Sequence, residues 1–204
     1  EPWFRTVPAL RDKVTLPQHF AAHGYTTLVT GKIFHDGQPP AEARSGEFSI
    51  FGPAGSHGPH PPRKLVETPS PMWLIDWGVY PSHDQEQDDF KVTSWAIEQL
   101  ASAPADKPWM LCVGLRKPHV PCFATQRWFD LYPLDGLIMP PVREDVREDV
   151  PRSAAYLNWR LPEPRLTWFR EHDQWAAFVR SYLACVSFMD SQVGRLLDAV
   201  VAAA

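Results

Sequence analysis

The feature that most constrains the fold is a short run rich in β-branched residues, 25–30, enclosed by a glycine at each end. Six residues of this composition are typical of a strand buried in a sheet, because a helix would show a longer pattern. Upstream, Thr15 and Pro17 are typical of the first turn of a helix. We therefore predict a helix and then a buried strand, with Lys32 and His35 just past the carboxyl end of that strand.

A second apolar run, residues 108–115, follows a helical stretch and leads into Lys117 and His119. Alternation of helices and strands favours a parallel sheet in an α/β fold. In open sheets of this kind, ligands bind beyond the carboxyl ends of the strands. We expect Lys32, His35 and His119 to face one crevice.

Residues 36–87 contain many prolines and glycines and no sustained period, which predicts a long irregular insertion. Loops of this length inside compact domains tend to be functional or disordered. Trp73 and Trp77 within it are candidates for a wall that stacks against sugars, but anchoring of the loop or core is favoured because an indole buries a large area. A metal site at His57 and His60 is not favoured, because zinc normally recruits a fuller ligand set.

Three further helices are predicted in the rest of the chain. The acidic residues of 82–89 are typical of the amino-terminal end of a helix, and the apolar stripe in 92–100 continues it. Residues 123–131 predict a short helix, and 175–200 predict a long amphipathic helix.

Composition supports a globular segment with a core and argues against some partners. The 204 residues are 44% hydrophobic and carry a net charge of -4. Nucleic-acid binding normally needs a clustered basic footprint, and a membrane span needs a long apolar run. Neither pattern is present in the sequence. The three cysteines, Cys112, Cys122 and Cys185, lack metal or redox spacing and are interpreted as buried structural thiols.

Three ordered blocks span nearly the whole chain and carry a family resemblance: residues 14–35, 107–121 and 182–198. They resemble the sulfatases of the alkaline phosphatase superfamily, and among them the iduronate-2-sulfatase-like group. The resemblance implies a partial alkaline phosphatase-like α/β fold. It also implies that residues 1–204 are an internal segment of the catalytic domain, without its amino-terminal nucleophile and metal region or its carboxyl-terminal metal ligands.

The cofactors that the resemblance implies are calcium and a formylglycine made from a cysteine in a Cys-x-Pro-x-Arg motif. Cys112 and Arg116 have the spacing of that motif, but the proline is absent and the cysteine lies in a predicted strand. We therefore expect both cofactors in the parent enzyme and neither from this segment, which we expect to be inactive alone.

By resemblance, Lys32 binds the non-bridging oxygens of sulfate, and His35 orients the formylglycine diol. His119 binds sulfate and protonates the leaving group, while Lys117 is a further candidate for substrate binding. A lysine stabilises growing negative charge, and a histidine exchanges protons near neutral pH, so these residue types suit a sulfate ester.

The expected function is hydrolysis of sulfate esters on a sulfated carbohydrate, in a parent enzyme that the resemblance implies to be exported or periplasmic. Two alternatives stay open. A phosphate or phosphonate ester hydrolase of the same superfamily would also bind a tetrahedral anion with lysine and histidine. A noncatalytic carbohydrate-binding or interaction domain would keep the fold of the family without its catalytic activity.

Overall fold

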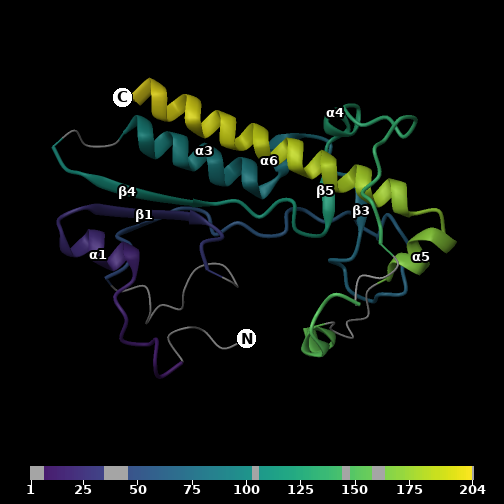
Figure 1. The fold of residues 1–204 in the computed structure, drawn as a ribbon. Helices are drawn as coiled ribbons and strands as arrows, with labels where there is room; N and C mark the ends of the chain where they lie inside the picture. Colours follow the sequence, from purple (N-terminus) through teal and green to yellow (C-terminus); the bar gives the residue numbers. More distant parts are fainter. Residues whose placement is uncertain (1–6, 35–45, 103–105, 144–147, 158–163, 204) are drawn as a thin grey trace. The chain divides into compact units, whose positions relative to one another are not determined.

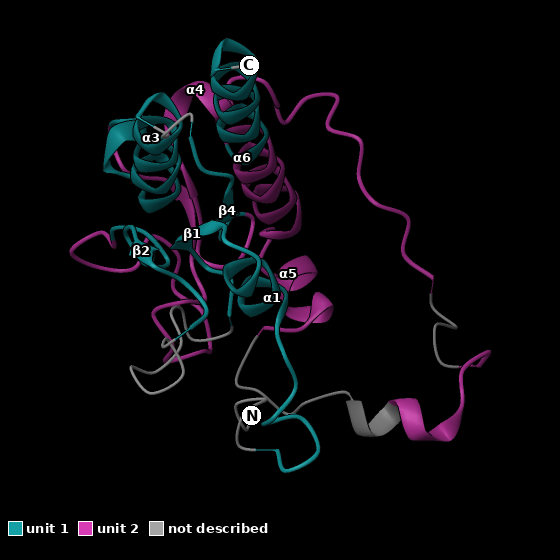
Figure 2. Ribbon diagram, turned by 90° about the vertical axis from the view of Figure 1, so that its left-hand side faces the viewer, with its two compact units in different colours: residues 1–59, 83–117, 189–204 teal, residues 60–82, 118–188 magenta. Residues whose placement is uncertain are grey.

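The structure is a computed structural model that describes residues 7–34, 46–102, 106–143, 148–157 and 164–203. The chain forms two compact units, which Figure 2 distinguishes by colour. Unit 1 comprises residues 1–59, 83–117 and 189–204, and unit 2 comprises residues 60–82 and 118–188. The last helix, α6 (Trp175–Ala203), contributes its first half to unit 2 and its second half to unit 1.

Unit 1 is built on a parallel sheet with the strand order β2-β1-β4. Strand β1 (Thr26–Gly31) pairs with β2 (Ile50–Phe51) on one side and with β4 (Trp109–Gly114) on the other, both in parallel. The register of β1 and β4 runs from Thr26 opposite Trp109 to Gly31 opposite Gly114. The predicted pair of parallel strands is therefore confirmed.

The helix before β1 begins and ends where its sequence predicts. Helix α1 (Leu16–Ala22) has Pro17 in its first turn, and the Thr15 N–H donates to Gln18 Oε1 at 2.9 Å. After the helix, Gly24 adopts a φ of +83°, which glycine reaches without the steric cost of a Cβ. The chain can thus turn at once into β1.

Helix α3 (Asp88–Ala101) lies over one face of this sheet, while α1 lies on the other side of it (Figure 1). A short 3₁₀ helix, η2 (Asp84–Glu86), precedes α3. Val92, Ala96 and Leu100 form the buried stripe of α3, as the spacing predicts. The amino terminus of α3 lies at the carboxyl edge of the sheet, since Asp89 bonds to residues just after β4.

Unit 2 contains a two-stranded parallel sheet of β3 (Trp77–Val79) and β5 (Cys122–Ala124). It also holds the short helices α4 (Gln126–Phe129), η3 (Arg152–Leu157) and α5 (Leu166–Glu171). The predicted helix over 123–131 is partly wrong, because residues 122–124 are a strand and only 126–129 are helical. The backbone N–H of Cys122 bonds to the Asp76 carbonyl at 2.9 Å, and this pairing with a distant segment outweighs local helix propensity.

Aromatic side chains form the core of unit 2. Trp77 is 2% exposed and packs against Phe169 and Phe178, each with ring centroids 5.2 Å away. Trp73, in contrast, is 50% exposed. Trp77 is thus a core residue, and a sugar-stacking role is open only to Trp73.

Cys122 and Cys185 are buried free thiols, as predicted, while Cys112 is a half-buried free thiol.

In the described parts of the chain, none of the helices is both long enough and apolar enough to span a membrane.

Candidate functional site

The candidate site is the carboxyl edge of the unit 1 sheet, where β1 and β4 end side by side. The Lys32 N–H donates to the Gly114 carbonyl oxygen at 2.8 Å. A Cβ on Gly31 would lie 1.9 Å from that same oxygen, and Gly31 has a φ of +71°. Only glycine fits this position, so the backbone directs the half-buried Lys32 out of the sheet at a defined point.

Lys117 lies at the same edge, three residues beyond β4. Its side chain is buried, with 7% of the residue exposed. A buried lysine is costly unless charges or polar groups stabilise it, and Lys117 interacts electrostatically with Asp89. The structure therefore places two of the predicted cationic residues, Lys32 and Lys117, at the same edge of the sheet.

His119 belongs to unit 2 and is exposed. Its Nδ1 lies 2.6 Å from the Val120 carbonyl oxygen. Because a carbonyl only accepts, this contact assigns a proton to Nδ1 and, in the neutral ring, leaves Nε2 as the basic nitrogen. Chain connectivity keeps the Cα atoms of Lys117 and His119 within about 7 Å of each other. His35 lies outside the described residues.

Residues 53–58 pass along the same edge and bring to it His57, which the sequence suggested only as a disfavoured metal ligand. The Gly31 N–H donates to the Pro53 carbonyl at 2.8 Å, which holds this loop against the end of β1. Further along it, His57 Nε2 accepts from Arg116 Nη1 at 3.0 Å. Arg116 thus adds a third cation to the edge that carries Lys32 and Lys117.

Two neighbouring acids at the start of α3 face this edge in different ways. Asp89 is 4% exposed, and its carboxylate accepts the backbone N–H groups of Arg116 at 2.9 Å and Lys117 at 2.8 Å. Burial raises the pKa of Asp89 above its ordinary value, and the two N–H donors and the Lys117 charge oppose this only in part.

Asp88, the preceding residue, is bonded differently. Its carboxylate accepts a hydrogen bond from the Ser56 hydroxyl and pairs with Lys91 at 3.1 Å. Partial burial acts to raise the pKa of Asp88, but the hydrogen bonds from Ser56 and Lys91 outweigh it and hold the pKa below its ordinary value. The helix-dipole interpretation of this acidic stretch was therefore incomplete, since Asp89 also binds the turn after β4. Sequence carries little signal for such a contact, because its partners are 27 and 28 residues away.

The edge suits an anionic ligand better than a metal ion. Lys32, Arg116 and Lys117 supply positive charge where parallel strands end, which is the usual ligand position in open α/β sheets. Across the described ranges, no group of three or more His, Cys, Asp and Glu side chains is arranged to hold a metal.

Cys112 does not have the properties of a nucleophile. It lies within β4, and burial raises the pKa of its thiol, which disfavours the reactive thiolate. This position agrees with the interpretation of the Cys112–Arg116 spacing as a chance match.

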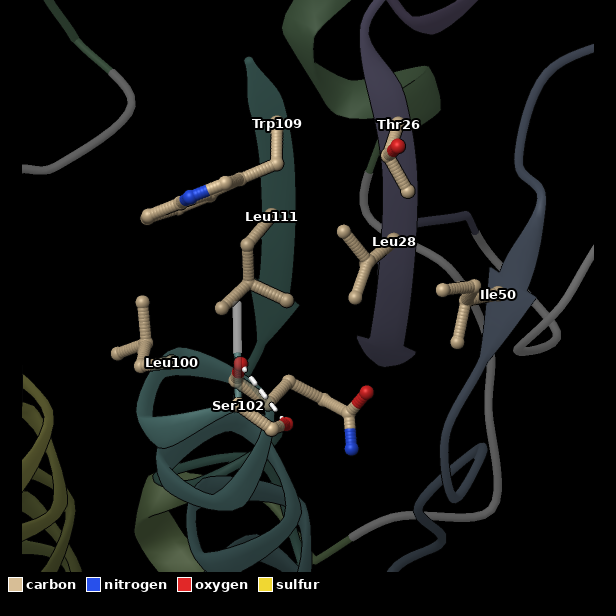
Figure 3. Close-up of a pocket in the computed structure, with 8 residues that line it drawn as sticks. Thr26, Leu28, Ile50, Leu100, Ser102, Trp109 and Leu111 are labelled. Carbon is tan, nitrogen blue, oxygen red and sulfur yellow. Dashed lines mark hydrogen bonds between the residues drawn. The ribbon is translucent and has the colours of Figure 1, made fainter. Parts of the chain in front are cut away.

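An apolar pocket of about 120 Å³ lies elsewhere in unit 1, between the sheet and the carboxyl end of α3 (Figure 3). Leu28, Ile50, Leu100, Trp109 and Leu111 supply most of its lining. These residues come from the first half of β1 and β4, from β2 and from the end of α3, so the pocket is not at the edge that carries the lysines.

Comparison with known proteins matches this chain to one protein family. The family model described as Sulfatase matches residues 2–203. A sulfatase of Formosa agariphila is 31% identical over 94% of this chain and 39% of its own length. Human iduronate 2-sulfatase is 27% identical over 91% of this chain and 36% of its own length. The chain thus spans somewhat over a third of the length of these relatives.

A solved structure shows the same fold at low sequence identity. It is described as a protein in complex with its substrate, D-glucosamine-2-N,6-O-disulfate, and it aligns with a TM-score of 0.50 and 16% identity. The alignment covers 94% of this chain and 47% of that one.

Proposed function

Because this chain belongs to the sulfatase family, we propose that the enzyme containing it hydrolyses sulfate esters of a carbohydrate. The observation that carries the proposal is the placement of Lys32 and Lys117 at one edge of the parallel sheet. We further propose that residues 1–204 are an internal segment of the catalytic domain, in keeping with the share of the relatives that they cover.

The proposed role of the lysines is to bind the non-bridging oxygens of sulfate. A sulfate ester is anionic, and negative charge shifts onto its oxygens as the ester bond breaks. A cation about 4 Å away, at an effective dielectric constant near 20, contributes roughly 4 kcal/mol before desolvation is counted. A lysine held by the sheet edge is preorganised for this contact and stabilises the transition state more than the ground state.

His119 is proposed to bind sulfate and to protonate the departing sugar oxygen. The Nδ1 contact with the Val120 carbonyl orients the ring and leaves Nε2 as the nitrogen that takes up and delivers a proton. His35, by family resemblance, is proposed to orient the nucleophile. A histidine can donate a hydrogen bond to an anion and can act as a general acid, which suits these two roles.

Formylglycine and calcium are proposed for the parent enzyme from residues outside 1–204. Formylglycine, where present, supplies the nucleophile that attacks sulfur. No step proposed for this chain depends on the metal.

The proposed substrate class is a sulfated carbohydrate. Two relatives support this class by name, since one is an iduronate 2-sulfatase and the structural neighbour binds a glucosamine disulfate. An iduronate-2-sulfate substrate is the finer proposal, and the 27% identity to the human enzyme supports it only distantly.

The test uses the full-length enzyme with matched aryl sulfate, aryl phosphate and aryl phosphonate substrates, followed by sulfated disaccharides. We expect turnover of the aryl sulfate to exceed turnover of the aryl phosphate and the aryl phosphonate. We also expect a Cys-x-Pro-x-Arg motif outside residues 1–204. Preferred phosphate turnover with a serine or threonine nucleophile would favour the phosphatase alternative. Carbohydrate binding without turnover of any ester would favour the noncatalytic alternative.

A further inference from the structure

The turn that carries Lys117 is attached to helix α3 by one side chain. The two carboxylate oxygens of Asp89 accept separate backbone N–H groups, those of Arg116 and Lys117, at 2.9 and 2.8 Å. Asp89 lies in the first turn of α3, where the helix dipole favours a negative charge. Its position is fixed in turn by burial, with 4% of the residue exposed.

This arrangement restrains the backbone more than one ordinary hydrogen bond would. Residues 115–117 lie beyond the last residue pair of β1 and β4, and unpaired buried N–H groups are costly. A carboxylate that accepts two consecutive N–H groups orients two peptide planes through bonds that are shorter and stronger than neutral ones. The backbone of Lys117 is therefore set by α3 as well as by the end of β4.

The burial of Asp89 is itself unfavourable, which argues against a role as a simple helix-end acid. Asp88 occupies the same helix turn and meets the same dipole, yet it bonds to Ser56 and Lys91 and leaves the turn after β4 untouched. An acidic residue whose only role was to interact with the helix dipole would be equally effective at the less buried position of Asp88. Asp89 instead reaches the segment that carries a proposed substrate-binding lysine.

We propose that Asp89 is a positioning residue for sulfate binding, which acts through the backbone of Arg116 and Lys117 to hold the Lys117 side chain in place. This inference rests on the proposed function, because it takes Lys117 as a contact to sulfate. Asp89 itself touches no substrate in this proposal.

The test is a double-mutant cycle in the full-length enzyme with Asp89→Asn and Lys117→Met. Asparagine keeps the shape of Asp89, but its NH₂ group cannot accept an N–H, so one of the two bonds is lost. Methionine keeps most of the stem of Lys117 and removes its charge. The readouts are kcat and KM for an aryl sulfate and the inhibition constant of inorganic sulfate, with Asp88→Asn as the matched control.

We expect Asp89→Asn to weaken inhibition by inorganic sulfate and to lower kcat/KM about tenfold or more, mainly through KM. Asp88→Asn removes the same charge one residue away. It should change the inhibition constant of sulfate and kcat/KM each by less than about threefold. In the Lys117→Met background, the effect of Asp89→Asn should shrink to less than about threefold, because the group that it positions is already gone.

An effect of Asp89→Asn that is equally large in both backgrounds would overturn the inference and assign Asp89 to general stability. A Lys117→Met enzyme with unchanged sulfate inhibition would overturn it too. In either case, retained sulfate ester turnover by the wild type would leave the proposed function standing. Absence of that turnover would refute the function and the inference together.

Folding of each variant is checked by thermal unfolding and near-UV circular dichroism. If Asp89→Asn does not fold, Asp89→Glu takes its place in the cycle. It keeps the charge but moves both oxygens by one methylene, so the same loss and the same non-additivity are expected.

Discussion

Gly31 and Gly114 lie opposite each other at the ends of β1 and β4, so close that a Cβ on Gly31 would be 1.9 Å from the Gly114 carbonyl oxygen. A Cβ on Gly114 would in turn lie 2.1 Å from the carbonyl oxygen of Lys32. Backbone atoms cannot yield as a flexible side chain does. The two glycines therefore determine where Lys32 leaves the sheet.

Substitution of Gly114 should disturb both stability and the position of Lys32. We expect Gly114→Ala in the full-length enzyme to lower the free energy of unfolding by about 1–3 kcal/mol, the usual cost of overpacking, and to lower kcat/KM for an aryl sulfate. Gly194→Ala is the matched control, because a Cβ there meets nothing within 4 Å and lies in helix α6. Alanine in a helix should leave stability unchanged or raise it by up to about 1 kcal/mol. Urea unfolding that ranks the two variants equally would contradict the steric account.

Removal of either proposed sulfate contact should lower turnover strongly. In the full-length enzyme, we expect Lys32→Ala and His119→Ala each to lower kcat/KM by on the order of a hundredfold or more, the scale of a lost electrostatic or proton-transfer contribution. Arg143→Ala is the control, because the Arg143 pair with Asp149 at 3.0 Å is exposed and such pairs contribute little. Folded variants are compared at equal metal and formylglycine content. Near-wild-type turnover of both site variants would remove the sulfate-binding assignment.

The two acids at the start of α3 should affect stability in opposite directions as pH changes. The folded-state pKa of Asp89 lies above the ordinary 3.8, so its contribution to stability is fully present below pH 3.8 and declines as pH rises through the folded pKa. The folded-state pKa of Asp88 lies below 3.8, so its contribution is present above pH 3.8 and is lost as pH falls through the folded pKa.

The measurement is the free energy of unfolding of Asp89→Asn and Asp88→Asn relative to wild type between about pH 3 and pH 6. The free energy of unfolding of Asp89→Asn, relative to that of wild type, should increase as pH rises above 3.8, because asparagine avoids the ionisation of a buried acid. Asp88→Asn should be less stable than wild type above pH 3.8, and this difference in stability should shrink only as pH falls below 3.8. Parallel curves for the two variants would contradict the assigned environments.

The tryptophans of the insertion should separate into a core residue and a surface residue. We expect Trp77→Ala to lower the free energy of unfolding by about 3–5 kcal/mol, because it deletes an indole that is 2% exposed. Trp73→Ala removes a side chain that is half exposed and should cost less than about 1 kcal/mol. Thermal and urea unfolding measure the difference, and equal losses would show that Trp73 also anchors the fold.

The 204-residue chain expressed alone should not turn over an aryl sulfate above a mock preparation. It contains no Cys-x-Pro-x-Arg motif, and its described residues form no donor set for calcium. Isothermal titration with calcium should accordingly show no tight site. Measurable turnover by the purified chain would place the nucleophile within residues 1–204 and overturn the division of the domain that we propose.

Local chemistry and apolar pattern sufficed to predict much of unit 1. Thr15 and Gly24 flank α1, and the two short apolar runs become β1 and β4 in parallel, as helix-strand alternation predicts. These features depend on neighbours a few residues away, so they are visible in sequence. The placement of Lys32 just after β1 follows from them.

Contacts between distant segments decided the rest. The strand at Cys122–Ala124 exists because β3 pairs with it, although its residues fit a helix pattern. The bonds of Asp89 to the turn after β4, and of His57 to Arg116, join residues 27 to 59 positions apart. No periodicity encodes such partners, because they meet only when the sheet brings the ends of its strands to one edge. Sequence alone thus determined the local elements and the residue types of the proposed site, while tertiary packing decided that the Asp89 side chain bonds to the backbone of Lys117.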